Sequence, residues 1–182
     1  MSQRIIRRSS SQSRVAVGDL LEAVLVGELL APGSRLWVVS PWLTDFPVID
    51  NRGGQFTQLD PTWGASRIRI SAVLRALIQR GVLVSVATRP GQSEEDFLDR
   101  LRSGAEADGS AARLRVRAAD DAGRHWAHEK ALVADTWALH GSMNFTFSGV
   151  ELNGELVTFT DDLAAVAELA SELSSIFEGD GA

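Results

Sequence analysis

Hydrophobic positions along the chain follow two patterns that alternate with each other. Helical spacing, with apolar residues three or four positions apart, marks residues 19–30, 67–80, 93–101 and 162–177. Compact apolar runs, which are typical of buried strands, occupy residues 36–39, 82–87, 130–134 and 155–159. Strands that alternate with helices predict an α/β fold, with a mixed β-sheet flanked by helices on both faces.

Two segments lack this regularity. Residues 1–17 are rich in Arg and Ser, so we expect a flexible N-terminal arm followed by a single domain over residues 18–182. Residues 43–66 are long and irregular, which is typical of a binding loop or of a surface excursion pinned by its aromatic residues. In the first case, Arg52 and Arg67 are candidates to contact a phosphate backbone.

Three arginines, Arg113, Arg115 and Arg117, alternate with apolar residues. This alternation predicts a strand with one Arg-lined face. Such a face suits either a position beside a substrate path or an edge strand that charge protects from pairing with other chains.

Composition narrows the classes of protein that fit. The 182-residue chain has the size of one domain and contains no cysteine, which excludes disulfides and thiolate metal sites. Its three histidines leave little material for a His-based metal centre, so we expect no metal and no cofactor. No apolar stretch is long enough to span a bilayer and no signal core is present, so we expect a cytoplasmic protein without membrane partners.

The net charge of −6 is unevenly distributed. Up to Arg89 the chain has eleven arginines against six acidic residues, and from Pro90 onward it has seven basic against eighteen acidic residues. Binding of a polyanion depends on the local field rather than on the mean charge. The first half of the chain therefore permits a basic channel.

The candidate chemistry lies around residues 128–144. Alternate side chains of a strand point to the same face, so His128 and Lys130 project together, as do Ser142 and Asn144 on the next segment. A turn at residues 135–136 would bring the two segments side by side. An imidazole, an ammonium, a hydroxyl and a carboxamide in one pocket suit phosphate chemistry.

Lys130 is the only lysine among eighteen basic residues. A chain that uses arginine at every other basic position retains lysine either by chance or because one site needs a compact ammonium rather than a planar fork.

The pattern His-x-Lys-x4-Asp followed by Gly-Ser-x-Asn, over residues 128–144, resembles the signature of the phospholipase D superfamily. Residues 145–155 continue the resemblance as many nucleases of that superfamily do. Five residues separate Asp135 from Gly141, one fewer than is common in the family, so we expect a tighter turn. The strong similarity covers about residues 124–159, and a looser one covers residues 35–90.

The resemblance implies a two-histidine mechanism and assigns roles to five residues. His128 would attack phosphorus and form a covalent phospho-histidine, while Lys130 and Asn144 hold the phosphoryl oxygens with Ser142 in support. Glu155 would accept the proton on the far ring nitrogen of His128. A second histidine would protonate the leaving oxygen, and a homodimer would supply it because the chain has a single motif.

The remaining candidates lie around this group. By resemblance, Asp135 has a structural role behind the catalytic residues, and Ser40, which follows the first strand, lies near the mouth of the site and is a candidate to bind substrate. His125 and His140 are more typical of bystanders, although His125 lies close enough to the motif to assist.

Substrate class is open at this stage because the superfamily includes lipases, lipid synthases, nucleases and toxins. The small size and single motif resemble bacterial endonucleases of the Nuc type, and Ser40-Pro41-Trp42 resembles phospholipase-D-like proteins of 7-deazaguanine DNA-modification and phage-defence gene clusters. The leading hypothesis is a metal-independent DNA endonuclease. The alternatives are a phospholipid hydrolase or transferase, and a non-cleaving nucleic-acid-binding subunit that works with other proteins of a DNA-modification or defence system.

Overall fold

The computed structural model describes residues 3–7, 11–118 and 128–178. At its centre lies a seven-stranded sheet with the spatial order β1-β9-β8-β7-β2-β5-β6. These strands are β1 (Gln3–Arg7), β2 (Arg35–Val39), β5 (Leu83–Thr88), β6 (Leu114–Ala118), β7 (Ala131–Ala134), β8 (Ala138–Gly141) and β9 (Leu156–Thr160). β2, β5 and β6 are parallel and all other neighbours are antiparallel, which confirms the predicted mixed sheet.

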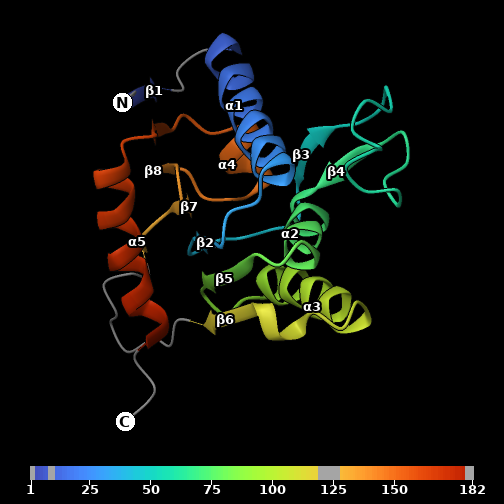
Figure 1. Ribbon diagram of the computed structural model, residues 1–182. Helices are drawn as coiled ribbons and strands as arrows, with labels where there is room; N and C mark the ends of the chain where they lie inside the picture. Colours follow the sequence, from blue (N-terminus) through green and yellow to red (C-terminus); the bar gives the residue numbers. More distant parts are fainter. Residues whose placement is uncertain (1–2, 8–10, 119–127, 179–182) are drawn as a thin grey trace.

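Helices cover both faces of this sheet, as predicted. They are α1 (Ser11–Leu30), α2 (Ile70–Gln79), α3 (Gln92–Ala107), the 3-10 turn η1 (Ala111–Arg113), α4 (Phe147–Glu151) and α5 (Leu163–Glu178). Figure 1 shows α5 alone on one side of the strands, with α1, α2 and α3 on the other. A large hydrophobic core lies on the side of α1 and α2, and a smaller one lies beneath α5.

The central strands read as continuous apolar runs because both of their faces are covered. In β2, Leu36 and Val38 belong to the large core, whereas Trp37 and Val39 belong to the core beneath α5. All four residues of β7 are buried in the same alternating way. The polar residues that adjoin these strands are therefore confined to the strand ends.

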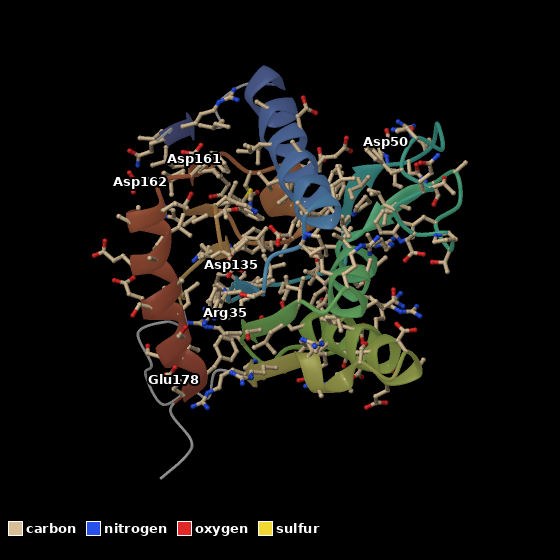
Figure 2. All side chains as sticks on the ribbon, in the orientation of Figure 1. Arg35, Asp50, Asp135, Asp161, Asp162 and Glu178 are labelled. Carbon is tan, nitrogen blue, oxygen red and sulfur yellow. The ribbon has the colours of Figure 1, made fainter. Side chains whose placement is uncertain are left out.

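The acidic start of α5 fits the predicted helix N-terminus. Asp162 Oδ1 accepts hydrogen bonds from the backbone N–H groups of Ala164 (2.9 Å) and Ala165 (3.2 Å). Figure 2 shows Asp162 at the first turn of this helix. These contacts satisfy amide groups that have no partner inside the helix, and a negative charge at this end suits the helix dipole.

Part of the range predicted as a flexible arm has regular structure. Gln3–Arg7 forms β1, which pairs antiparallel with β9 from Gln3↔Thr160 to Arg7↔Leu156, and α1 begins at Ser11 rather than near Asp19. The pairing depends on the unpaired backbone groups of β9 at the other end of the chain. The sequence of the N-terminal residues alone therefore does not indicate that they form a strand, because the strand they pair with comes from a distant part of the chain.

The irregular segment after β2 also contains strands. β3 (Pro47–Asp50) and β4 (Arg67–Arg69) form a separate two-stranded sheet, so α2 begins at Ile70 instead of Arg67. Phe46 and Trp63 are buried in the large core. Their burial favours the interpretation of an excursion pinned by aromatic residues.

The arginine-bearing strand is β6, which forms one edge of the seven-stranded sheet. This position supports the interpretation of a charge-protected edge over a strand beside the substrate path. Among the described helices, none combines the length and the apolar character that a membrane crossing requires.

Candidate active site

The strand register gathers the predicted residues at one edge of the sheet. β2 and β5 run in parallel and end at Val39 and Thr88, while the antiparallel β7 begins beside Val39 at Ala131. β8 ends at Gly141, which pairs with Val157 at the start of β9. Segments that follow β2, β5 and β8, and segments that precede β7 and β9, therefore meet at this edge. The ends of parallel strands are the usual place for ligands in open α/β sheets.

His128 lies just before β7 and is exposed. Its ring nitrogen Nε2 is 3.2 Å from Nη2 of Arg89, the residue that follows β5. A guanidinium only donates hydrogen bonds, so a hydrogen bond at this distance requires an unprotonated Nε2 with its lone pair directed at the cation. In such a hydrogen bond the hydrogen of a neutral ring would be on Nδ1.

Lys130 is held beside the same histidine. Its Nζ donates a hydrogen bond to the backbone oxygen of His128 at 2.6 Å. Burial lowers the pKa of the Lys130 ammonium; the negative charge of Glu155 opposes this shift, and the positive charge of Arg89 adds to it. Two cations, Lys130 and Arg89, thus flank His128.

Ser142 and Glu155 form a tight pair at the ends of β8 and β9. The Ser142 hydroxyl donates to Glu155 Oε2 at 2.5 Å and accepts from the backbone N–H of Leu156 at 3.0 Å. The resemblance implies that Glu155 bonds to the His128 ring. Within the described residues its hydrogen-bond partner is Ser142 instead, and it acts on Lys130 through its charge.

Asn144 is positioned by Ser40 from the end of β2. The Ser40 hydroxyl is 3.5 Å from Asn144 Oδ1, donates to the backbone oxygen of Trp42 at 2.7 Å and accepts from the Phe145 N–H at 3.2 Å. Because Asn144 turns its oxygen toward Ser40, its Nδ2 hydrogens remain for another acceptor. Ser40 is predicted to bind substrate, but it is only 1% exposed, so its hydroxyl fixes the backbone beside Asn144.

Two glycines permit close backbone approach around these residues. Gly141 has φ 151°, and a Cβ added there would lie 2.1 Å from the Leu156 backbone oxygen. A Cβ on Gly149 would lie 2.1 Å from the Asn144 backbone oxygen. A larger residue at Gly149 would displace the backbone of Asn144, and one at Gly141 would displace the backbone of Leu156, the residue after Glu155.

Asp135 is not brought to this edge, although it belongs to the same sequence motif. Its Oδ2 accepts hydrogen bonds from the Ser34 backbone N–H at 2.5 Å and from the Ser34 hydroxyl at 2.7 Å. Ser34 precedes β2, so Asp135 lies at the opposite edge of the sheet, where Figure 2 shows it near Arg35. The four residues of β7 correspond to about 13 Å, which places Asp135 out of contact with His128 and the residues around it.

The other predicted residues are also not among those that the structure brings together around His128. Arg52 is exposed and paired with Asp50 at 2.6 Å in the β3–β4 excursion, on the side of the molecule away from α5 (Figure 2). Arg67 belongs to β4 in the same excursion. His140 lines a cavity of about 390 Å³ beneath α5, and His125 lies outside the described residues.

Two residues of this edge were given no role in the site by the sequence analysis, where Trp42 appeared only as part of Ser40-Pro41-Trp42. Arg89 contacts His128, and its Cζ lies 5.7 Å from the ring centroid of Trp42, which is 50% exposed. Arg89 directly follows β5 and Trp42 lies three residues after the end of β2, in Thr-Arg-Pro and Ser-Pro-Trp sequences that are typical of ordinary strand ends. Only their positions after the ends of the parallel strands β2 and β5, which the sequence does not reveal, place these residues at the site.

The donor set has a definite chemical character. It combines one imidazole nitrogen with a lone pair, two cations, and hydroxyl and amide groups that can meet phosphate oxygens. Within the described residues no group of three or more His, Cys, Asp or Glu side chains is arranged to hold a metal ion. The site is therefore suited to bind an anionic, tetrahedral group.

The fold and the family agree with this geometry. Solved structures with the same fold include NucT from Helicobacter pylori, at 14% identity and a TM-score of 0.60 over 97% of this chain and 96% of that one. Nuc from Salmonella typhimurium, a phospholipase D family member, matches at 15% identity and a TM-score of 0.60 over 96% of this chain and 92% of that one. The archaeal chromatin protein TrmBL2 matches at 13% identity and a TM-score of 0.50 over 98% of this chain and 52% of that one.

A comparison with curated protein sequences gave no significant match. The family described as "Cardiolipin synthase, PLD-like domain" matches residues 60–180, well over half of the chain, and this range includes Arg89, His128 and Lys130. The chain therefore belongs to the family of phospholipase-D-like (PLD-like) domains.

Proposed function

We propose that this chain is a metal-independent phosphodiesterase, specifically a DNA endonuclease, that uses His128 as its nucleophile. Membership of the PLD-like family supports a phosphodiesterase-type activity. The observation that carries the proposal is the 3.2 Å contact between His128 Nε2 and the Arg89 guanidinium, beside the Lys130 ammonium. An imidazole nitrogen beside the Arg89 guanidinium, with the Lys130 ammonium on the backbone oxygen of the same residue, matches an attack on a phosphodiester, whose negative oxygens the two cations would receive.

The first chemical step follows from this arrangement. The Nε2 lone pair of His128 attacks phosphorus and forms a nitrogen–phosphorus bond, while the bond from phosphorus to the leaving ester oxygen breaks. Lys130 and the Asn144 amide would stabilise the oxygens that gain charge in the transition state. A water molecule then attacks the phospho-histidine, which releases the second product and restores the imidazole.

The leaving oxygen must receive a proton, and a second histidine is the natural donor near neutral pH. The motif occurs once in this chain, so we propose that the His128 of a second copy supplies the proton in a symmetric dimer. The same residue would then accept a proton from the attacking water. Specific activity is expected to fall on dilution below the dimer dissociation constant, and a strictly monomeric yet active protein would contradict this part of the proposal.

Nucleic acid is the substrate class that we favour. TrmBL2, which shares the fold, is described as binding DNA, while the matching family is named after a lipid synthase, so the fold by itself does not fix the substrate. The two cations that contact His128 suit the backbone of a nucleic acid. Work alongside proteins of a DNA-modification or phage-defence system stays a prediction from the sequence resemblance.

The direct test is cleavage of supercoiled and single-stranded DNA in the presence of EDTA. Wild-type protein is expected to cleave, and His128→Ala is expected to lose at least about a thousandfold of the rate because the nucleophile is gone. His140→Ala is the matched control, since it removes an imidazole that lines the cavity beneath α5.

Three outcomes would contradict the proposal. Cleavage that EDTA abolishes would refute the metal-independent mechanism. Equal activity of wild type and His128→Ala would refute the role of His128. Hydrolysis of phospholipid vesicles without any cleavage of DNA would refute the nuclease proposal and favour the alternative, a phospholipid hydrolase.

A further inference from the structure

Trp42 is the exception among the tryptophans that the structure describes. Trp37, Trp63 and Trp137 are 5–7% exposed, whereas Trp42 is 50% exposed and lies two residues after Ser40 at the active-site edge. Exposing a large aromatic ring forgoes a substantial hydrophobic stabilisation. Nothing in the proposed phosphoryl chemistry requires a tryptophan at this position.

The backbone around Trp42 is tied down on both sides. Its carbonyl oxygen accepts the Ser40 hydroxyl at 2.7 Å, and the N–H of Leu43 donates to the buried carboxylate of Glu94 at 3.2 Å. Leu43 also pairs with Phe145, which directly follows Asn144. The ring is therefore presented from a fixed backbone, and little conformational freedom remains to be lost when a ligand contacts it.

Arg89 connects this ring to the reacting histidine. Its Cζ lies 5.7 Å from the Trp42 ring centroid, which is within cation–π range, and its Nη2 lies 3.2 Å from His128 Nε2. One guanidinium thus spans from an exposed aromatic surface to the atom that would attack phosphorus. A nucleotide has the same layout, with an aromatic base joined through a sugar to a phosphate.

We propose that Trp42 and Arg89 form the nucleotide-binding surface of the site. Trp42 stacks on a base next to the scissile phosphate, and Arg89 donates to a non-bridging oxygen of that phosphate when it is released from His128. This inference rests on the proposed function and specifies its substrate as nucleic acid with an unpaired base. A base inside a duplex has both faces covered by its neighbours, so it cannot stack on Trp42 until it leaves the helix.

A surface that packs against a second copy of the chain is the alternative use for an exposed ring. The charge of Arg89 beside Trp42 favours the nucleotide, since an aromatic ring and a guanidinium together match a base and its phosphate. The two uses differ in what the loss of the ring would change. Stacking predicts a change in affinity for bases, and packing predicts a change in molecular mass.

The test measures binding in the His128→Ala background, so that nothing is cleaved. Fluorescence anisotropy would compare a labelled single-stranded oligonucleotide with an abasic oligonucleotide of the same length and backbone. Trp42→Ala is expected to weaken binding of the base-bearing strand by about 5- to 150-fold, the range for stacking of one base, and to leave the abasic strand unchanged. Trp42→Phe keeps an aromatic face and is expected to retain most of the affinity.

Two further variants sharpen the result. Arg89→Gln is expected to weaken both oligonucleotides and to reduce the salt dependence of binding by about one phosphate contact. Leu30→Ala is the control, because Leu30 is 70% exposed at the end of α1, near the opposite sheet edge. It is expected to change neither affinity.

Equal weakening of both strands by Trp42→Ala, no weakening at all, or a loss of dimer mass in that variant would overturn this inference. The results for binding and for cleavage separate a failure of this inference from a failure of the proposed function. Base-dependent binding that needs Trp42, in a protein that never cleaves, would refute the proposed function and support the nucleotide-binding surface. If the wild type cleaved DNA but the base-bearing and abasic oligonucleotides bound equally well, the proposed function would be supported and the nucleotide-binding surface would be refuted.

Discussion

Replacing Asp135 with alanine removes two hydrogen bonds from the turn between β7 and β8. The carboxylate accepts the backbone N–H and the hydroxyl of Ser34, at 2.5 Å and 2.7 Å. Both residues are exposed, so each bond is expected to contribute near the ordinary net value of about 1 kcal/mol rather than the larger value for a buried charge. The free energy of unfolding should therefore fall by about 2 kcal/mol. For a chain of this length, that corresponds to a melting temperature lower by about 4–8 °C.

Urea unfolding followed by circular dichroism would measure this change. Ser34→Ala removes only the hydroxyl donor and is expected to cost about 1 kcal/mol, whereas adding it to Asp135→Ala should cost nothing further, since the acceptor is already absent. Asp135→Asn keeps one acceptor oxygen and should fall between wild type and Asp135→Ala. Well below the melting temperature, DNA cleavage per folded molecule should match wild type, because about 13 Å of β7 separates this turn from His128.

The reverse pattern would refute this reasoning. If Asp135→Ala unfolded like wild type but lost most of its activity, Asp135 would act on the catalytic residues, and the structural role derived from Ser34 would be wrong. Full additivity of the Ser34 and Asp135 variants would likewise show that the two side chains are not energetically coupled.

Three further predictions concern other parts of the chain. Glu28→Gln should lower the free energy of unfolding, measured in urea, by about 1–3 kcal/mol. Both carboxylate oxygens of Glu28 accept hydrogen bonds, from the Gly33 N–H and from Trp137 Nε1 at 2.9 Å, whereas an amide has a single acceptor oxygen. An unchanged urea midpoint would contradict this prediction. Hydrogen bonds from Arg52 hold the pKa of Asp50 at about 2, so its stabilisation is present at neutral pH and is lost as the pH falls toward 2; in an NMR titration, Arg52→Ala should return the pKa of Asp50 toward 3.8. Burial lowers the pKa of Lys130 below 10.5, so the alkaline loss of kcat/KM should begin at a lower pH than an ordinary lysine would give.

The sequence by itself determined the class of fold and the core of the candidate site. Period and composition are local properties, so the strands at β2, β5, β7 and β9 and most of the helices follow from them. The spacing of His128 and Lys130 and the Gly-Ser-x-Asn segment are also local, and the strand register then places both at one edge of the sheet.

Only the tertiary structure decided which distant residues join that site and which nearby ones do not. Arg89 reaches His128, and Trp42 reaches Arg89, because two parallel strands end beside the start of β7, a register fixed by hydrogen bonds between segments far apart in the chain. Asp135 is seven positions from His128 but lies at the other edge, since an extended strand carries it away at about 3.3 Å per residue. The pairing of β1 with β9 joins residues 3–7 to residues 156–160 in the same way. Local patterns determine what each segment becomes, whereas long-range backbone pairing determines what each segment meets.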